Sequence, residues 1–83
     1  MEAVVVPAGS QATGRSVGEV APTQRFGVQV AGLHRAGGRI LNPRAGEMLA
    51  AGDELLVLGT PEQIRHFKEW LRDQAEDRTA PGK

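Results

Sequence analysis

The fold of this chain is decided by the stretch Gly52-Asp-Glu-Leu-Leu-Val-Leu-Gly59, which runs directly into Thr60-Pro-Glu-Gln63. The continuous apolar run predicts a central strand buried on both faces, and the glycine-aspartate pair before it predicts a tight turn. Thr60 fits a helix N-cap, the proline fits the first helical position, and Gln63 completes a capping box. The stretch therefore predicts a sheet strand followed at once by a helix that packs on the sheet.

The helix after this N-cap has an apolar face at helical spacing. That face consists of Ile64, Phe67 and Leu71, and Trp70 lies at its edge. The chain turns polar toward its end, which is typical of a frayed terminus. We expect one folded domain over residues 1–74 and a disordered polar tail over residues 75–83.

Upstream of the turn, shorter patterns predict three more strands and a short helix. Ser16 and Glu19 have the spacing of a capping box, and Pro22 is expected to end that helix. The expected elements are strands at residues 2–6, 26–34, 39–42 and 54–58, a short helix at 16–21 and a long helix from 61. This order predicts an α+β fold, with a small mixed or antiparallel sheet of about four strands and helices on one side.

The second expected strand is apolar on both faces. Phe26, Val28 and Val30 alternate along one face, but Ala31 and Leu33 make the opposite face apolar too. Either a β-bulge reverses the alternation or a partner chain covers the second face. We favour the partner, and therefore expect a homodimer whose interface includes Val28, Val30, Ala31 and Leu33.

Composition excludes several functions. The 83 residues include no cysteine and two histidines, so we expect no disulfide, no metal site and no metal cofactor. Ten basic and ten acidic residues balance, which predicts no nucleic-acid partner. The half up to residue 44 holds five arginines and two acidic residues, a net +3 that could suit a small anionic ligand.

No residues form a recognisable catalytic set, so we expect a chain that is not an enzyme. The segment Gly9-Ser-Gln-Ala-Thr-Gly-Arg-Ser16 resembles a phosphate-binding loop, but Arg15 stands where that loop needs lysine. The first strand begins at residue 2 without any lead-in, which indicates a domain cut from a longer chain.

Taken in order, these segments resemble the RCK C-terminal (TrkA-C) domain family, where RCK stands for regulator of conductance of potassium. The resemblance runs from about Glu2 to Leu71 and depends on five segments in the family's order and spacing. They are Val4-Val-Val-Pro7, Gly14-Arg-Ser-Val-Gly-Glu-Val20, Arg25-Phe-Gly-Val-Gln-Val-Ala-Gly-Leu-His-Arg35, Asn42-Pro43 and Leu49-Ala-Ala-Gly-Asp-Glu-Leu-Leu-Val-Leu-Gly59.

The resemblance implies a cytosolic regulatory, ligand-sensing and dimerising domain of a prokaryotic potassium or cation transport protein. The parent protein would be a cation:proton antiporter, a potassium channel or a potassium-uptake regulator. The domain would lie at the cytoplasmic side of the cell membrane, within or bound to a membrane transporter. The alternative is a purely structural oligomerisation domain of such a transporter that binds no small molecule.

The resemblance also implies a ligand at the dimer cleft, with cyclic di-AMP as the candidate. Family members that bind this dinucleotide resemble one another in an Asp-x-Arg segment after the short helix and an Asn on the next strand. Here those positions hold Ala21, Thr23 and Gln29, so a different ligand or none stays open. The implied ligand-binding residues are Val17, Thr23, Arg25, Gln29 and His34.

Overall fold

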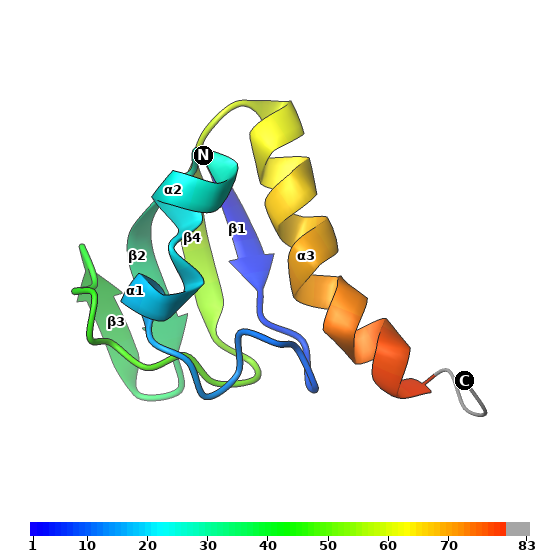
Figure 1. The fold of residues 1–83 in the computed structure, drawn as a ribbon. Helices are drawn as coiled ribbons and strands as arrows, with labels where there is room; N and C mark the ends of the chain where they lie inside the picture. The colour runs from blue at the N-terminus through cyan, green and yellow to red at the C-terminus, as the bar shows by residue number, and fades with distance from the viewer. Residues whose placement is uncertain (80–83) are drawn as a thin grey trace.

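A four-stranded antiparallel sheet in the order β1-β4-β2-β3 forms one layer of the molecule (Figure 1). The computed structural model describes residues 1–79, with side chains over residues 1–72. The strands are β1 (Glu2–Val5), β2 (Gln29–Arg35), β3 (Gly38–Leu41) and β4 (Glu54–Leu58), and the helices are α1 (Val17–Val20), α2 (Pro22–Phe26) and α3 (Pro61–Thr79). The expected α+β class is confirmed.

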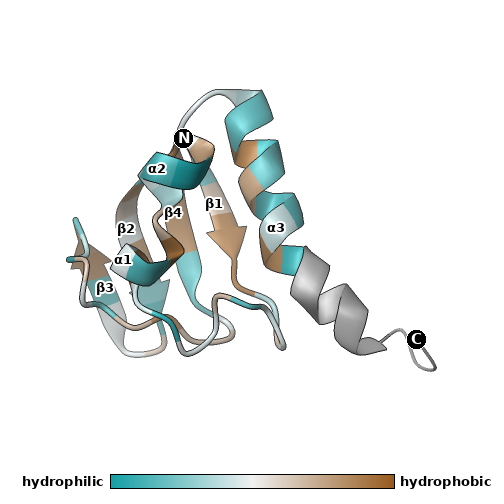
Figure 2. Ribbon diagram, viewed as in Figure 1, coloured by the Kyte–Doolittle hydropathy of each residue, from teal (hydrophilic) through white to brown (hydrophobic). Residues whose placement is uncertain are grey.

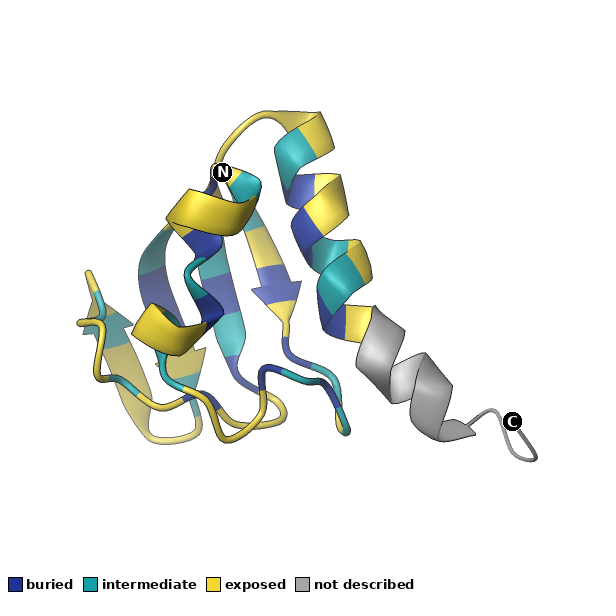
Figure 3. Cartoon of the chain, in the orientation of Figure 1, coloured by how far each residue is buried: buried dark blue, intermediate teal, exposed yellow. Residues whose placement is uncertain are grey.

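The helices lie over one face of the sheet and enclose the core there (Figures 1 and 3). Leu55 and Val57 of β4 point into this core, where Phe67 of α3 is fully buried. Hydropathy follows the same division, with apolar residues concentrated on β1, β4 and one side of α3 (Figure 2). The opposite face is open: Leu56 is half-buried and Leu58 is 39% exposed. The expectation that β4 is buried on both faces is therefore wrong.

Both predicted capping boxes form. The Ser16 hydroxyl accepts from the backbone N–H of Glu19 at 3.1 Å, while the Glu19 carboxylate accepts from the Ser16 N–H at 2.9 Å. Thr60 and Gln63 exchange the same pair of bonds at 3.1 Å and 2.9 Å. These contacts satisfy backbone N–H groups that have no partner within a helix, and so fix where α1 and α3 begin.

The region before β2 differs from the prediction. Pro22 ends α1, but it also occupies the first turn of a second helix, α2, which includes Phe26. Gly27 then ends α2 in the left-handed region at φ 76°, and a Cβ there would lie 2.7 Å from the Gln63 amide nitrogen. Phe26, the first residue of the alternating pattern, therefore belongs to a helix, and the strand begins only at Gln29.

A β-bulge explains why the second strand is apolar on both faces. The pairing of β2 with β4 shifts between Val30 and Gly32, which leaves Ala31 as the extra residue. Val28 and Leu33 are consequently both buried in the chain's own core. The prediction that these two side chains form a dimer interface is corrected, since the bulge, and not a partner, accounts for them. Val30 and Ala31 are partly exposed.

Helix α3 continues past the predicted domain boundary at residue 74 and ends at Thr79. Residues 80–83 of the expected tail lie outside the described residues. Within the described part of the chain, no helix combines the length and hydropathy that a membrane span requires.

Candidate functional site

The residues predicted to bind a ligand do not gather at one place. Val17, Thr23 and Gln29 line one hollow beside α1 and α2. His34 lines a second hollow at the β2–β3 hairpin, and Arg25 lies against the aromatic side chains between α2 and α3. The structure thus separates the five residues into three locations.

We call the first of these the helix-side hollow. Its volume is about 360 Å³, and it lies between α1, α2, the start of β2 and the chain that follows β3. Its lining residues are Val17, Gly18, Ala21, Pro22, Thr23, Gln24, Gln29, Val30, Asn42, Pro43 and Ala45. Every side chain in this lining is uncharged.

The backbone of the helix-side hollow is unusual. Ala21 at φ 51° and Asn42 at φ 49° are the two non-glycine residues with positive φ in the described chain, and both line the hollow. The Asn42 N–H donates to the Ala31 carbonyl at 2.9 Å, which holds the chain in this conformation. Such backbone conformations cost about 1–3 kcal/mol each and cluster at functional sites.

Polar groups of the helix-side hollow are available to a ligand in different ways. The Thr23 hydroxyl donates its hydrogen to the Val28 carbonyl at 2.9 Å, so it can only accept a further bond. Gln24, Gln29 and Asn42 are exposed, and each carboxamide carries both a donor and an acceptor. The hollow therefore offers acceptors and neutral donors.

Arg25 is engaged elsewhere. Its guanidinium carbon lies 4.8 Å from the Trp70 ring centroid and 5.4 Å from that of Phe26. Its Nη1 also donates to the Val20 carbonyl at 3.5 Å. These cation–π contacts hold the arginine between α2 and α3, so its predicted part in ligand binding stays a prediction that this geometry does not favour.

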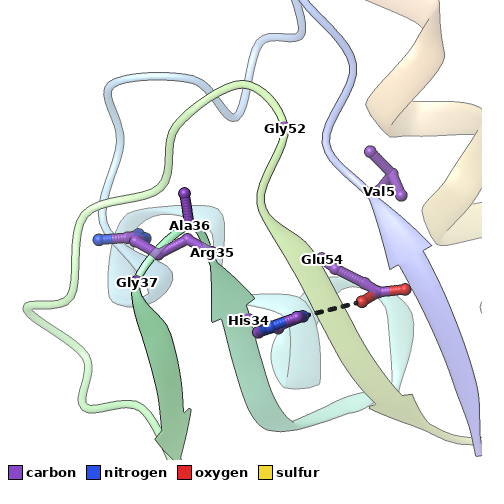
Figure 4. A pocket seen from close by; sticks show the side chains of 7 residues that line it. All are labelled: Val5, His34, Arg35, Ala36, Gly37, Gly52 and Glu54. Carbon is purple, nitrogen blue, oxygen red and sulfur yellow. Dashed lines mark hydrogen bonds and ion pairs between the residues drawn. The ribbon is translucent and has the colours of Figure 1, made fainter.

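The second hollow, which we call the hairpin hollow, lies where the β2–β3 turn meets the turn before β4 (Figure 4). It measures about 400 Å³ and is lined by Val5, His34, Arg35, Ala36, Gly37, Gly52 and Glu54. His34 Nδ1 lies 3.4 Å from the Glu54 carboxylate, with the two side chains 54% and 42% exposed. An exposed pair of this kind contributes about 0–1 kcal/mol to stability.

A charged cluster behind the hairpin hollow was not predicted. The Arg35 guanidinium binds both carboxylate oxygens of Asp53, at 3.1 Å and 2.7 Å, and donates to the Met48 carbonyl at 2.8 Å. Asp53 also accepts from the Ala50 N–H at 2.8 Å, which confirms its predicted part in the turn. The Asp53 side chain is 4% exposed, and its hydrogen bond with the Arg35 guanidinium is the main cause that raises the pKa of Arg35.

This cluster is connected to the helix-side hollow through the segment 44–50. Arg35 fixes one side of the segment through Met48 and, at 3.4 Å, through the Glu47 carboxylate. On its other side the Glu47 and Ala45 carbonyls accept from the N–H groups of Val17 and Gly18, at 2.9 Å and 2.8 Å. The arginine at the end of β2 thus positions one wall of the hollow. The only sequence signal for this role is the position of Arg35 at the end of a strand, because no short sequence spacing links Arg35 to Asp53.

The part of the chain that the structure describes holds no group of three histidine, aspartate or glutamate side chains that could bind a metal ion.

Solved structures with the same fold include domains of three proteins. The RCK_C domain dimer of S. agalactiae BusR in complex with c-di-AMP matches with a TM-score of 0.80 and 20% identity, covering 86% of this chain and 93% of that one. The RCK C domain of the potassium transport protein KtrA in complex with c-di-AMP matches with a TM-score of 0.72 and 20% identity, covering 82% of this chain and 80% of that one. The GsuK channel bound to NAD matches with a TM-score of 0.72 and 19% identity, covering 87% of this chain and 13% of that one. At these identities the likeness establishes the fold.

One expectation about partners is overturned. The balanced charge predicted no nucleic-acid partner, but BusR is also known in complex with its busAB-promoter DNA, in a chain of which this one covers 35%. Net charge of a single domain is a poor guide here, because the DNA complex is formed by a protein that contains much more than this domain.

The family is identified by sequence. A search of curated protein sequences finds no match. The family model of the TrkA-C domain, in contrast, matches residues 1–72, which span every strand and most of α3. The chain therefore belongs to the TrkA-C domain family, the type of regulatory domain that occurs in potassium transport proteins and their regulators.

Proposed function

We propose that this chain is the ligand-sensing and dimerising regulatory domain of a prokaryotic potassium or cation transport system, either a cation:proton antiporter or a potassium channel or uptake regulator. It acts without catalysis, at the cytoplasmic side of the cell membrane. Binding of a small ligand would change the relative stability of transporter states only through different affinities for those states.

The observation that carries this proposal is the helix-side hollow. It brings together Val17, Thr23 and Gln29, three of the residues implied for ligand binding, and it contains both strained non-glycine residues. Its volume lies at the small end of the ~300–1,000 Å³ typical of small-molecule sites. Two related RCK_C domains hold c-di-AMP, so this dinucleotide is the first probe to use.

The proposed dimer places a second copy beside β3. Leu41 of this edge strand is 75% exposed and directly precedes Asn42, which lines the hollow. Val30 and Ala31 are partly exposed nearby on β2. The related BusR domain is a dimer, and we expect a second copy of this chain to cover the exposed apolar side chain of Leu41 at this edge of the sheet.

Light scattering after size exclusion, with and without c-di-AMP, tests the proposal. We expect a dimer that Leu41→Lys converts to monomer, because a buried lysine without a partner is costly. Val5→Lys on β1, at the opposite edge of the sheet and 56% exposed, is the matched control and should remain dimeric.

Two outcomes would contradict the proposal in different ways. A chain that stays monomeric at high concentration, with or without c-di-AMP, would contradict dimerisation. A dimer whose melting temperature is unchanged by nucleotides would favour the purely structural oligomerisation domain, since a ligand at 100 times its Kd adds about 2.7 kcal/mol.

A further inference from the structure

The face of the sheet that points away from the helices, which we call the open face, carries two rows of residues that cross the strands (Figure 1). Directly paired residues of antiparallel neighbours point to the same face, so the strand register defines each row. The apolar row consists, from β1 to β3, of Ala3, Leu56, Gly32 and Leu41. The charged row consists, in the same direction, of Val5, Glu54, His34 and Arg39.

The apolar row leaves hydrophobic surface in contact with water. Leu41 is 75% exposed, and Leu56 is half-buried. Gly32 lies between them without a side chain, and Leu56 leans over it, since a Cβ on Gly32 would lie 3.1 Å from Leu56 Cδ1. Neighbouring apolar side chains that stay exposed across several strands mark a contact surface.

The charged row carries an acid and a base on opposite sides of β2. Glu54 lies on β4, Arg39 lies on β3, and His34 stands between them on β2. The Glu54 side chain is 42% exposed and lies 3.4 Å from His34 Nδ1 (Figure 4). Arg39 is exposed and makes no ion pair within the residues that the structure describes. Both charges are therefore accessible to a surface that presents them in the reverse order.

We propose that the open face binds a second copy of this chain face to face, about a twofold axis that runs parallel to the strands and is centred on β2. This operation places β4 of one copy opposite β3 of the other. Glu54 then faces Arg39 of the second copy, and Leu56 faces its Leu41, and each contact occurs twice. Aligned packing of this kind is the common arrangement of two sheets. The contact goes beyond the proposed dimer beside β3, which does not require it.

The order of charges selects this axis over its alternatives. An axis centred on β4 would oppose Glu54 to itself, and an axis centred on β3 would oppose Arg39 to itself, so like charges would repel. An axis between β4 and β2 would place Arg39 opposite the apolar Val5. An axis between β2 and β3 would leave Glu54 without an opposing strand. Centring on β2 pairs both charges and both leucines of the two rows.

Sedimentation velocity over a range of protein concentrations tests this contact, with charge reversal as the probe. We expect the natural chain to form a species larger than the proposed dimer at high concentration, and added salt to weaken that association. Glu54→Arg and Arg39→Glu should each weaken it by about tenfold or more, because each change opposes like charges at two symmetry-related places. The double variant restores opposite charges and should recover the association to within about threefold of the natural chain.

Two control variants test the position of the contact. Val5→Lys changes the charged row itself, but β1 has no opposing strand when the axis is centred on β2. Glu62→Arg reverses an exposed charge in the first turn of α3, outside the open face. Both variants should associate as the natural chain does.

Each outcome decides the inference. It is overturned if the double variant associates no better than the single variants, or if the two controls weaken association as much as Glu54→Arg does. It is also overturned if no species larger than a dimer forms and charge reversal leaves the dimer intact, whereas the proposed dimer beside β3 then survives. A chain that is monomeric at every concentration contradicts both contacts. If single reversals convert the dimer itself to monomer and the double variant restores it, the open face is the dimer contact, and the contact beside β3 is wrong.

Discussion

The helix-side hollow and the hairpin hollow have similar volumes, about 360 Å³ and 400 Å³, but opposite chemistry. The first has an uncharged lining on a strained backbone that includes Ala21. The second is lined by His34, Arg35 and Glu54, and it stands next to the buried Asp53. The charged side chains of the hairpin hollow are paired within the chain and stabilise the fold. The exposed carboxamides of the helix-side hollow remain available to a ligand.

The contrast predicts where substitutions affect stability and where they affect binding. Changes behind the hairpin hollow should mainly alter the free energy of unfolding, because its charges are paired with one another. Changes in the helix-side hollow should mainly alter ligand affinity. The segment 44–50 joins the two hollows, so damage to the Arg35 cluster should also reach the ligand site.

The largest effect is expected from Arg35→Met. It leaves the Asp53 carboxylate buried without its bidentate partner, which costs about 3–5 kcal/mol in a fully buried pair. Because the Arg35 side chain is 36% exposed, we expect about 2–3 kcal/mol here. The raised pKa of Arg35 means that, while the Asp53 carboxylate carries its charge, the pair contributes its full stability below the arginine pKa of the unfolded chain and loses it only as the pH rises through the arginine pKa of the folded chain. Urea denaturation measures the loss.

Arg39→Met is the control for this prediction, since it removes an exposed arginine from the neighbouring strand β3. It should change stability by less than about 0.5 kcal/mol. Equal losses in the two variants would show that the Asp53 contact contributes nothing specific. Arg35→Met should also weaken c-di-AMP binding under conditions where the chain is still folded, because the Glu47 and Met48 contacts position the wall of the helix-side hollow.

Local signals explain which parts of the fold could be predicted from sequence. The capping boxes at Ser16 and Thr60 and the apolar run in β4 are contiguous patterns, and each correctly predicts its helix or strand, although β4 is buried on one face and not on both. The helix α2 was missed because Phe26-Gly-Val28 imitates strand alternation, while the left-handed Gly27 that ends the helix has no unique sequence signal.

The candidate site was harder to predict than the elements. A bulge at Ala31 changes which residues of β2 face the core, and it depends on pairing with the distant β4. Val17, Thr23 and Gln29 could be placed together only through the family resemblance. The separation of His34 from these residues depends on the sheet register, in which it pairs with Glu54, and so could not be read from local spacing.

An intermediate effect is expected where the backbone of the helix-side hollow is strained. Ala21→Gly removes the left-handed penalty of about 1–2 kcal/mol but increases the entropy of the unfolded chain. We expect a net gain of about 0.5 kcal/mol, measured as a higher melting temperature. Ala36→Gly in the hairpin hollow is the matched control, because Ala36 has no positive φ and should lose stability instead. Two variants that shift in the same direction would mean that the strain at Ala21 is not the cause.

The smallest effect is expected from Glu54→Gln. Glu54 contacts His34 at 3.4 Å across β4 and β2, but both side chains are about half exposed, so water and salt screen the pair (Figure 4). We expect a change of about 0.5 kcal/mol or less in the free energy of unfolding, and no change in c-di-AMP affinity. Asp53→Asn makes the same chemical change at the preceding residue and should cost at least about 2 kcal/mol, because that carboxylate is buried and holds a guanidinium. Urea denaturation of both variants compares two adjacent acids directly. If Glu54→Gln lost more stability than Asp53→Asn, the exposed carboxylate of Glu54, and not the buried one of Asp53, would be the charge that stabilises the fold.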